Sequence, residues 1–192
     1  VNYGGENVVA VYSSTGPVNG SRWYTGGGIY RSVWLRSSNQ TRIARHGLYV
    51  NTEGDKVNVQ VQVVGWQRHE VQIKACVKDA AGKVVASAEK GMPDHTIQNN
   101  TEVLLPPMTV TNPLLWDLVQ PNLYTVEAVL VENGVVIDSL SDNFGFRTIE
   151  YGTDFGFKLN GKKVFLTGIA NHHDLGALGV AAFPDAIERQ LR

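Results

Sequence analysis

The sequence has a single cysteine, Cys76, so no disulfide can form within the chain and the redox environment is left open. Its 17 basic and 18 acidic residues almost cancel, which argues against nucleic acid or an anionic membrane surface as a partner. No apolar run approaches the ~20 residues that span a bilayer. With 43% hydrophobic and 18% charged residues, the composition is that of a globular protein able to bury a core.

Alternation of apolar and polar residues with period two dominates the middle of the sequence. The stretches KVNVQVQVV at 56–64 and VQIKACVK at 71–78 follow this pattern throughout. Each predicts a strand of an antiparallel sheet with one buried and one solvated face. The residues expected to face the core are Val57, Val59, Val61 and Val63 in the first strand, and Val71, Ile73, Ala75 and Val77 in the second.

Turn residues separate these strands from further ones. The sequence DAAGK at 79–83 predicts a hairpin, the pair Pro106 and Pro107 predicts a bend or a sheet edge, and Asn133-Gly134 suits a type I′ turn. With TRIARHGLYVNT at 41–52, about seven strands fall between residues 40 and 149, which is typical of an immunoglobulin-like antiparallel β-sandwich. Since no disulfide is available, apolar burial must hold the two sheets together.

The two ends of the chain differ from this middle. Residues 7–14 and 29–38 are strand-like but need a partner sheet, because two strands alone are marginal in water. Near the C-terminus, we predict a hairpin turning at Asn160-Gly161, a strand over 163–170 (KVFLTGIA), the polar loop NHHD and a helix that begins near Pro184. Strand, loop and helix make one β/α unit, and a closed (β/α)₈ barrel needs ~250 residues. We therefore expect only the first unit of a barrel, within a fragment of a longer protein.

Four motifs place the sequence in a known family: SRWYTGGGIYRSVWL at 21–35, NPLLWDLVQPNLYTV at 112–126, FGFRTIEY at 144–151 and GFKLNGKKVFLTGIANHHDLGALG at 156–179. In these motifs and their order the sequence resembles the glycoside hydrolase family 2 enzymes, and among them the bacterial β-galactosidases. The resemblance implies three parts. Residues 1–38 would end a jelly-roll sugar-binding domain, residues 39–150 would form the immunoglobulin-like sandwich, and residues 151–192 would start a truncated (β/α)₈ barrel.

The resemblance implies that the longer protein hydrolyses terminal β-galactosyl bonds with retention, by two carboxylates that act as acid/base and nucleophile. Both would lie beyond Arg192, so we assign no catalytic residue here and expect the fragment to be an inactive scaffold between domains. The expected partners are a β-galactoside and the missing part of the barrel, and no cofactor is expected. β-Glucuronidase, β-mannosidase and a non-catalytic carbohydrate-binding or adhesive module stay open as alternatives, as do self-association and the cellular compartment.

The NHHD loop supplies the candidate sugar-binding residues. Family members place a histidine after the first barrel strand, and either His172 or His173 would take this position. A neutral imidazole can donate to a sugar hydroxyl and strengthen that bond as charge develops. Asn171 stands where other members have an arginine, and Asp174 would cap the loop or orient a histidine. Adjacent side chains on extended backbone point to opposite faces, so we predict no metal site at these histidines.

Other motif residues have structural or weaker binding interpretations. Arg22 lies in a loop that approaches the sugar pocket in the family, so it is a candidate contact to a substrate hydroxyl, although the neighbouring aromatic residues would serve equally well as interdomain packing. Trp66 and Trp116 are expected in the core or rim of the sandwich rather than as sugar platforms. Arg147 is expected to tie the sandwich to the barrel through backbone carbonyls.

Overall fold

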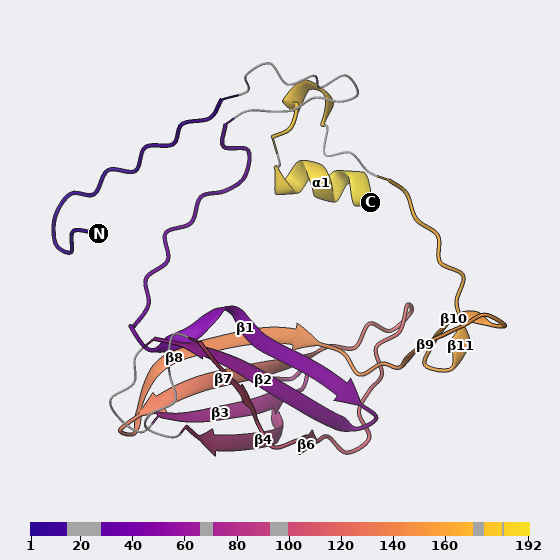
Figure 1. The fold of residues 1–192 in the computed structure, drawn as a ribbon. Helices are drawn as coiled ribbons and strands as arrows, with labels where there is room; N and C mark the ends of the chain where they lie inside the picture. Colours follow the sequence, from indigo (N-terminus) through magenta and orange to yellow (C-terminus); the bar gives the residue numbers. More distant parts are fainter. Residues whose placement is uncertain (15–27, 66–70, 93–99, 171–174, 182) are drawn as a thin grey trace. The chain divides into compact units, whose positions relative to one another are not determined.

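Two antiparallel sheets packed face to face form the main body of the protein in the computed structural model (Figure 1). The structure describes residues 1–192 except 15–27, 66–70, 93–99, 171–174 and 182. These residues divide into two units, one of Ser37–Leu166 and the other of Val1–Arg36 with Thr167–Arg192. The sandwich belongs to the first unit.

The two sheets contain the strands that the alternating pattern predicts. In the first sheet β1 (Arg42–Glu53), β2 (Lys56–Val64) and β5 (Thr101–Leu104) lie in that order, and β6 (Met108–Thr109) also pairs with β2. In the second sheet the order is β4 (Val84–Gly91), β3 (Val71–Lys78), β7 (Tyr124–Glu132) and β8 (Val135–Phe144). Prolines 106 and 107 separate β5 from β6, because a residue without an N–H cannot donate to the ladder. If β5 and β6 are counted as one interrupted strand, the two sheets contain seven strands among the described residues, as predicted.

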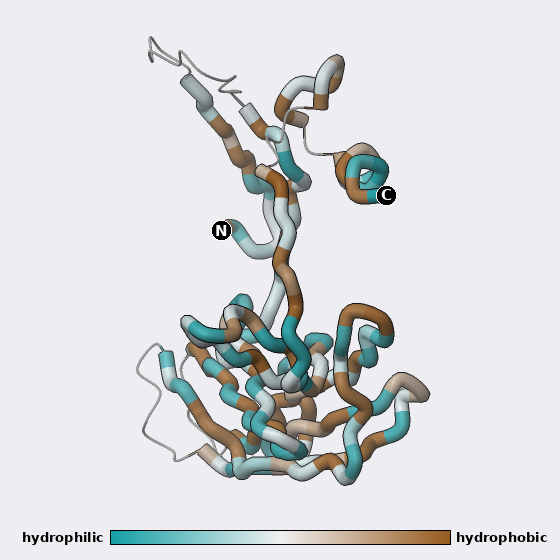
Figure 2. The backbone as a smooth tube through the Cα atoms, turned by 90° about the vertical axis from the view of Figure 1, so that its right-hand side faces the viewer, coloured by the Kyte–Doolittle hydropathy of each residue, from teal (hydrophilic) through white to brown (hydrophobic). Residues whose placement is uncertain are grey.

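The inward-facing residues form one apolar core, as predicted. The four inward-facing valines of β2, at 57, 59, 61 and 63, have no exposed surface, and neither do Val71, Ile73 and Val77 of β3, while Ala75 is 3% exposed. Hydrophobic and hydrophilic residues alternate along these strands. Figure 2 shows brown and teal segments alternating along the tube of the sandwich. From β7, Val126, Ala128 and Leu130 complete the facing layer. The sheets are therefore held together by apolar contact, without a disulfide.

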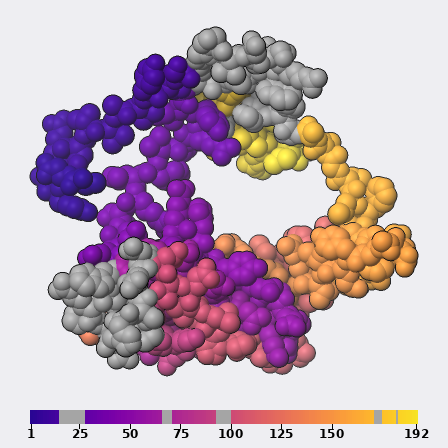
Figure 3. All heavy atoms as spheres, in the orientation of Figure 1, coloured from indigo at the N-terminus to yellow at the C-terminus, as the bar shows by residue number. Residues whose placement is uncertain are grey.

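A tight turn joins β7 to β8, as the Asn-Gly pair predicts. Asn133 has φ 51° and Gly134 has φ 79°, and two consecutive positive φ values are the requirement of a type I′ turn. Asn160 and Gly161 repeat this geometry with φ 51° and 75°, between β10 (Gly156–Leu159) and β11 (Lys162–Lys163). With β9 (Ile149–Gly152) these strands form a three-stranded meander, which Figure 3 shows as orange atoms at one end of the sandwich.

The strand predicted over 163–170 is wrong beyond its first residue. Only Lys162–Lys163 pair in β11, and residues 164–170 have no regular secondary structure. Phe165 is 88% and Ile169 is 89% exposed. A parallel barrel strand gains its hydrogen bonds and its burial from neighbours on both sides. Among the described residues, the N–H of Val164 donates to the carbonyl of Phe157 at 3.0 Å, and no strand pairs with the segment beyond it. Its apolar sequence alone therefore does not make a strand.

The lack of a neighbouring strand among the described residues also explains why two further predicted strands, near the N-terminus, are absent from the structure. The described parts of the predicted strands at 7–14 and 29–38 are not strands, and Trp34 and Leu35 are 84% and 100% exposed.

The predicted helix is present as α1 (Pro184–Leu191), with Pro184 as its first residue, after a short 3₁₀ turn over Gly176–Leu178. No helix among the described residues is both long and apolar enough to cross a membrane.

Truncating Ile73 should test how much the sandwich depends on its apolar core. Ile73→Ala removes a side chain with no exposed surface, and we expect it to lower the free energy of unfolding by about 2–5 kcal/mol. The adjacent Lys74 points outward and makes an exposed ion pair with Glu89 at 3.6 Å, so Lys74→Ala should change it by less than about 0.5 kcal/mol. Urea unfolding of both variants gives the comparison; equal losses would contradict this assignment of the core.

Candidate functional site

The sugar-binding residues predicted from the sequence lie outside the described residues. Asn171, His172, His173 and Asp174 fall in the gap at 171–174, and Arg22 falls in the gap at 15–27. Their roles stay predictions. Directly after the first gap, the N–H of Leu175 donates to the carbonyl of Gly179 at 2.9 Å, which closes a tight turn before α1.

Glu188 is the glutamate nearest to this loop in the sequence, and its surroundings are those of a solvated helix residue. It lies on α1 with a 60% exposed side chain, and its carboxylate pairs with Arg192 one helical turn later at 2.5 Å. An exposed carboxylate in an i,i+4 pair is typical of a helix surface. Glu188 is therefore an exposed residue of the helix surface, and the expectation that this chain holds no catalytic carboxylate stays a prediction.

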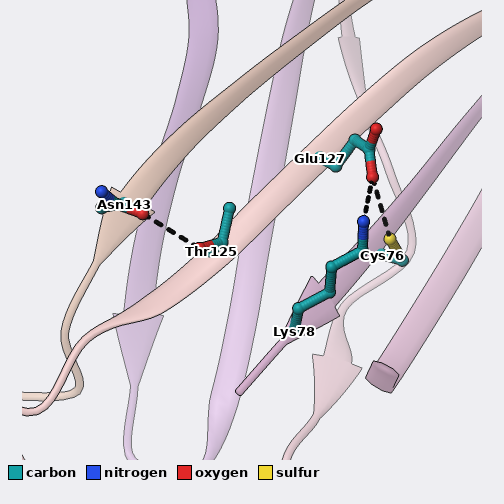
Figure 4. A network of polar contacts seen from close by, with 5 residues as sticks. All are labelled: Cys76, Lys78, Thr125, Glu127 and Asn143. Atoms are coloured by element: carbon teal, nitrogen blue, oxygen red, sulfur yellow. Dashed lines mark hydrogen bonds and ion pairs between the residues drawn. The ribbon is translucent and has the colours of Figure 1, made fainter. Parts of the chain in front are cut away.

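The surroundings of Cys76 are also those of a residue with a structural role. It lies on the outward face of β3, where Glu127 of β7 accepts from its thiol at 4.0 Å and also pairs with Lys78 (Figure 4). Burial raises the pKa of the thiol above its ordinary value, and Glu127 raises it further, against the opposing effect of Lys78. A reactive cysteine needs a lowered pKa. Cys76 is therefore a strand residue, as predicted, and its raised pKa disfavours the reactive thiolate.

The most organised polar region of the described chain is the connection from β6 to β7, residues 112–123, which we call the junction loop. The carboxylate of Asp117 accepts the N–H groups of Val119 at 2.7 Å and Gln120 at 2.6 Å. These two hydrogen bonds, the one from Gln120 above all, hold the pKa of Asp117 below its ordinary value. Such bonds satisfy backbone donors inside the loop and fix its shape.

A buried tyrosine joins the junction loop to the sandwich. The hydroxyl of Tyr124, at the start of β7, accepts the N–H of Leu114 at 3.0 Å. Its ring packs edge-to-face on Phe146 with centroids 5.0 Å apart and lies beside Phe144. Immunoglobulin-like sandwiches commonly place a tyrosine at this corner, where its hydroxyl bonds to backbone upstream. The sequence NLYTV contained this signal, but its partner Leu114 is defined only by the fold.

A second connection joins the junction loop to the meander. The amide of Asn160 donates to the carbonyl of Trp116 at 3.0 Å and accepts the N–H of Thr148 at 2.9 Å. The N–H of Trp116 in turn donates to the carbonyl of Phe146 at 2.8 Å. One side chain therefore fixes three segments that are distant in the sequence. The Asn-Gly turn was visible in the sequence, whereas these contacts were not.

Trp116 and Arg147 stack where these segments meet. The guanidinium carbon of Arg147 lies 5.0 Å from the centre of the Trp116 ring, a cation–π geometry. Gly145 packs against the same side chain, and a Cβ at this glycine would lie 2.6 Å from the Trp116 Cβ. Trp116 is half-buried, in agreement with its predicted place at the rim. The contact of Arg147 with Trp116 was not predicted.

An open pocket of 790 Å³ lies beside this stack, within the sandwich unit. One wall is the C-terminal half of β1 from Tyr49 to Glu53, with Gly54 after it. The rest of the lining comes from Trp116, Leu123, residues 143–145 and residues 147–149. Aromatic rings, amides, hydroxyls, a carboxylate and a guanidinium all line it. Among the described residues, no group of three or more histidine, cysteine or acidic side chains gathers as a metal site would require.

Known proteins share this fold and are similar to this chain in sequence. The sequence profile of Glycosyl hydrolases family 2 matches residues 41–147, which is more than half of the chain. The chain belongs to glycosyl hydrolase family 2. The match begins at the start of β1 and ends after β8, so the family's conserved pattern coincides with the sandwich observed here.

Individual family 2 proteins are similar over almost the whole chain. Beta-galactosidase BoGH2A of Bacteroides ovatus is 33% identical over 97% of this chain and 22% of its own length. A putative beta-glucuronidase of Formosa agariphila is 32% identical over 86% of this chain and 20% of its length. The crystal structure of a family 2 member from Bacteroides cellulosilyticus, 35% identical, covers 88% of this chain and 24% of its own with a TM-score of 0.79. The chain thus spans about a fifth of the length of these curated relatives.

The connection made by Asn160 can be tested against a matched turn. Asn133 has the same φ of 51° and also precedes a glycine, but its side chain makes no hydrogen bond among the described residues. The loss of unfolding free energy in Asn133→Ala should therefore reflect only the strain of alanine at positive φ. Asn160→Ala should cost about 1–2 kcal/mol more in unfolding free energy, because it also leaves the Thr148 N–H and the Trp116 carbonyl without their partner. Urea titration of the two variants gives the difference, and equal losses would mean that the contacts stabilise nothing.

The lowered pKa of Asp117 makes a prediction for the pH dependence of the junction loop. Because the folded protein favours the carboxylate, its contribution is complete above the ordinary aspartate pKa of about 3.9 and is lost as the pH falls through the lowered value. We expect NMR to give a lower pKa for the Asp117 carboxyl than for an aspartate in a model peptide. The amide N–H groups of Val119 and Gln120 should exchange faster as it protonates. Asp117→Asn should abolish this pH dependence, and its persistence would assign the effect to another group.

Proposed function

We propose that a longer polypeptide containing this chain is a retaining glycosidase that releases terminal β-galactosyl residues. The observation that carries the proposal is the likeness to beta-galactosidase BoGH2A, which extends over 97% of the chain and includes the NHHD region. Family membership supports glycoside hydrolysis in general. The choice of galactose rests on this relative and on the histidine loop.

In this proposal the chain acts as a scaffold and does not hydrolyse substrate by itself. Residues 39–150 are its sandwich domain, residues 1–38 end a jelly-roll domain and residues 151–192 begin the catalytic barrel. The acid/base and the nucleophile of a retaining mechanism would be two carboxylates ~5–5.5 Å apart, supplied by sequence outside this chain. The exposed, paired setting of Glu188 supports this assignment, since it has neither the burial nor the neighbour that either role requires.

The NHHD loop would supply contacts to the sugar. A neutral imidazole of His172 or His173 donates a hydrogen bond to a ring hydroxyl, and this bond strengthens as positive charge and acidity develop in the transition state. Asn171 and Asp174 flank the histidines and orient the loop. Arg22 would contact a further hydroxyl from the jelly-roll side.

A β-glucuronidase is the second candidate, because the Formosa agariphila relative is named a putative beta-glucuronidase and is nearly as similar as BoGH2A. The two specificities differ at one group of the substrate. A uronate requires a cation for its carboxylate, whereas galactose requires neutral donors and acceptors for its hydroxyls.

Assays of the longer protein and of this chain test the proposal. We expect the longer protein to hydrolyse p-nitrophenyl β-galactoside at least about tenfold faster than the β-glucuronide, a difference of about 1.4 kcal/mol in barrier. NMR should detect the β-anomer of galactose as the first product. The 192-residue chain alone should show no hydrolysis above a mock preparation. Preference for the glucuronide would overturn the galactosyl specificity, and activity of the isolated chain would overturn the scaffold role.

The histidine assignment has its own test in the longer protein. Of His172→Ala and His173→Ala, we expect one to lower kcat/KM by about 10²-fold or more and the other to change it only slightly, because adjacent side chains face opposite ways. His46, an exposed histidine on β1, provides the matched control, and His46→Ala should leave kcat/KM unaltered. If both histidine variants kept a nearly normal kcat/KM, the loop would not contribute to the sugar site.

A further inference from the structure

The pocket between β1 and the Trp116–Arg147 stack has the size and the lining of a small-molecule site. Its volume of 790 Å³ lies within the range of about 300–1,000 Å³ that ligand pockets occupy. All of its lining residues belong to the sandwich unit, and none of them belongs to the proposed NHHD site. Neither the family match nor the names of the relatives assign a role to it.

The wall that contains Trp116 is rigid before any ligand arrives. The N–H of Trp116 bonds to Phe146 and its carbonyl accepts from Asn160. Its side chain packs against Gly145, and the guanidinium carbon of Arg147 lies 5.0 Å from its ring centre. A wall fixed in this way loses little conformational entropy on binding.

The opposite wall has polar groups that the fold leaves unused. Tyr49, Asn51 and Glu53 alternate on the outward side of β1 and are exposed, with Tyr49 at 62%. Within the part of the chain that the structure describes, the side chains of Asn51 and Glu53 make no hydrogen bond or ion pair, and β1 pairs only with β2. An amide, a carboxylate, a phenol and the free backbone edge of β1 therefore face the pocket with unused donors and acceptors.

These features together fit a sugar. A pyranose has apolar C–H faces that pack on aromatic rings, and hydroxyls that each donate and accept, so it needs rings, amides and charged groups in one site. An extended peptide would need only the backbone edge and would leave the rigid aromatic wall without a function. Arg147 already lies over the Trp116 ring, whereas Glu53 has no ion pair among the described residues. The uncompensated charge beside a ligand is therefore the Glu53 carboxylate, which favours an uncharged sugar over a uronate.

We propose that this pocket is an accessory binding site for a neutral hexopyranoside, separate from the NHHD loop. In this proposal Trp116 is a rim residue that also contacts the sugar, which departs from the sequence interpretation of Trp116. The choice of a sugar rests on the pocket chemistry and on membership of a glycosidase family, and not on the galactosyl specificity proposed above. Because the pocket is open and lacks a lid among the described residues, the expected affinity is modest, with a Kd of about 1–10 mM.

The test uses the 192-residue chain itself and a binding readout, so its outcome is independent of hydrolysis. In a ¹H–¹⁵N titration with methyl β-D-galactoside, we expect saturable shifts of the Trp116 indole N–H, the Asn51 side-chain amide and the backbone N–H groups of β1 from Tyr49 to Glu53. The indole of Trp34, which is 84% exposed and lies in the other unit, serves as the internal reference and should not shift. Methyl β-D-glucuronide should bind at least about threefold more weakly, because Glu53 repels its carboxylate.

Two variants locate the site. Asn51→Ala and Glu53→Ala change exposed residues, so the fold is expected to persist, and each should weaken binding by about fivefold or more through the loss of a hydrogen-bonding group. Asn58→Ala makes the same change as Asn51→Ala on the neighbouring strand, directly opposite in the β1–β2 register but outside the pocket lining, and should leave the Kd unchanged. Tighter binding of the glucuronide overturns the choice of a neutral sugar. The site itself is overturned by any of three results: no pocket shifts up to about 50 mM galactoside, equal shifts with glycerol, or equal effects of Asn51→Ala and Asn58→Ala.

Discussion

Apolar contact between the two sheets is the constraint on which the rest of the structure depends. Fully buried valines of β2 face Val71, Ile73 and Val77 of β3 and the inward residues of β7, and each such side chain contributes about 1.5–3 kcal/mol by its burial. With no disulfide between the sheets, this contact also sets strand register. A slip of one residue would turn every buried valine to solvent and bring glutamines into the core. The ends of the strands, and everything attached to them, are placed by this register.

The junction loop shows how the ends of the sandwich are used. Its own carboxylate, Asp117, fixes the turn at its tip, while Tyr124 and Asn160 attach it to the core and to the meander. Asp117 satisfies backbone groups of its own loop, whereas Tyr124 and Asn160 satisfy those of another segment, which would otherwise be left to water. The result is a rigid platform for Trp116 and Arg147 at the edge of the sandwich.

The sugar site that we propose on the sandwich would have a physical meaning if the longer protein is the proposed glycosidase. A second binding site on one polypeptide would hold a branched or polymeric substrate and raise its effective concentration at the catalytic centre without any change in the chemistry. Such a site gains from being rigid and open, because it must release the chain between cleavages. The fixed Trp116 wall and the unpaired groups of Asn51 and Glu53 meet both conditions.

The sequence by itself determined the strands of the sandwich, their inward faces and their tight turns. These depend on local rules, namely alternation along a strand and positive φ at Asn133-Gly134 and Asn160-Gly161. The start of α1 at Pro184 follows from a local rule as well. The four motifs were enough to recognise the family, but the sugar-binding loop at 171–174 stays a prediction from the sequence.

Only the tertiary structure decided the rest. The bonds from Asn160 to Trp116 and from Leu114 to Tyr124, and the pocket they shape, join residues that no periodicity relates. The segments 7–14, 29–38 and 163–170 have strand-like sequences and yet are almost entirely without strand structure in the described residues. A strand is completed by the hydrogen bonds and the burial that its neighbours supply, and a sequence can specify its own alternation but not the presence of a neighbour.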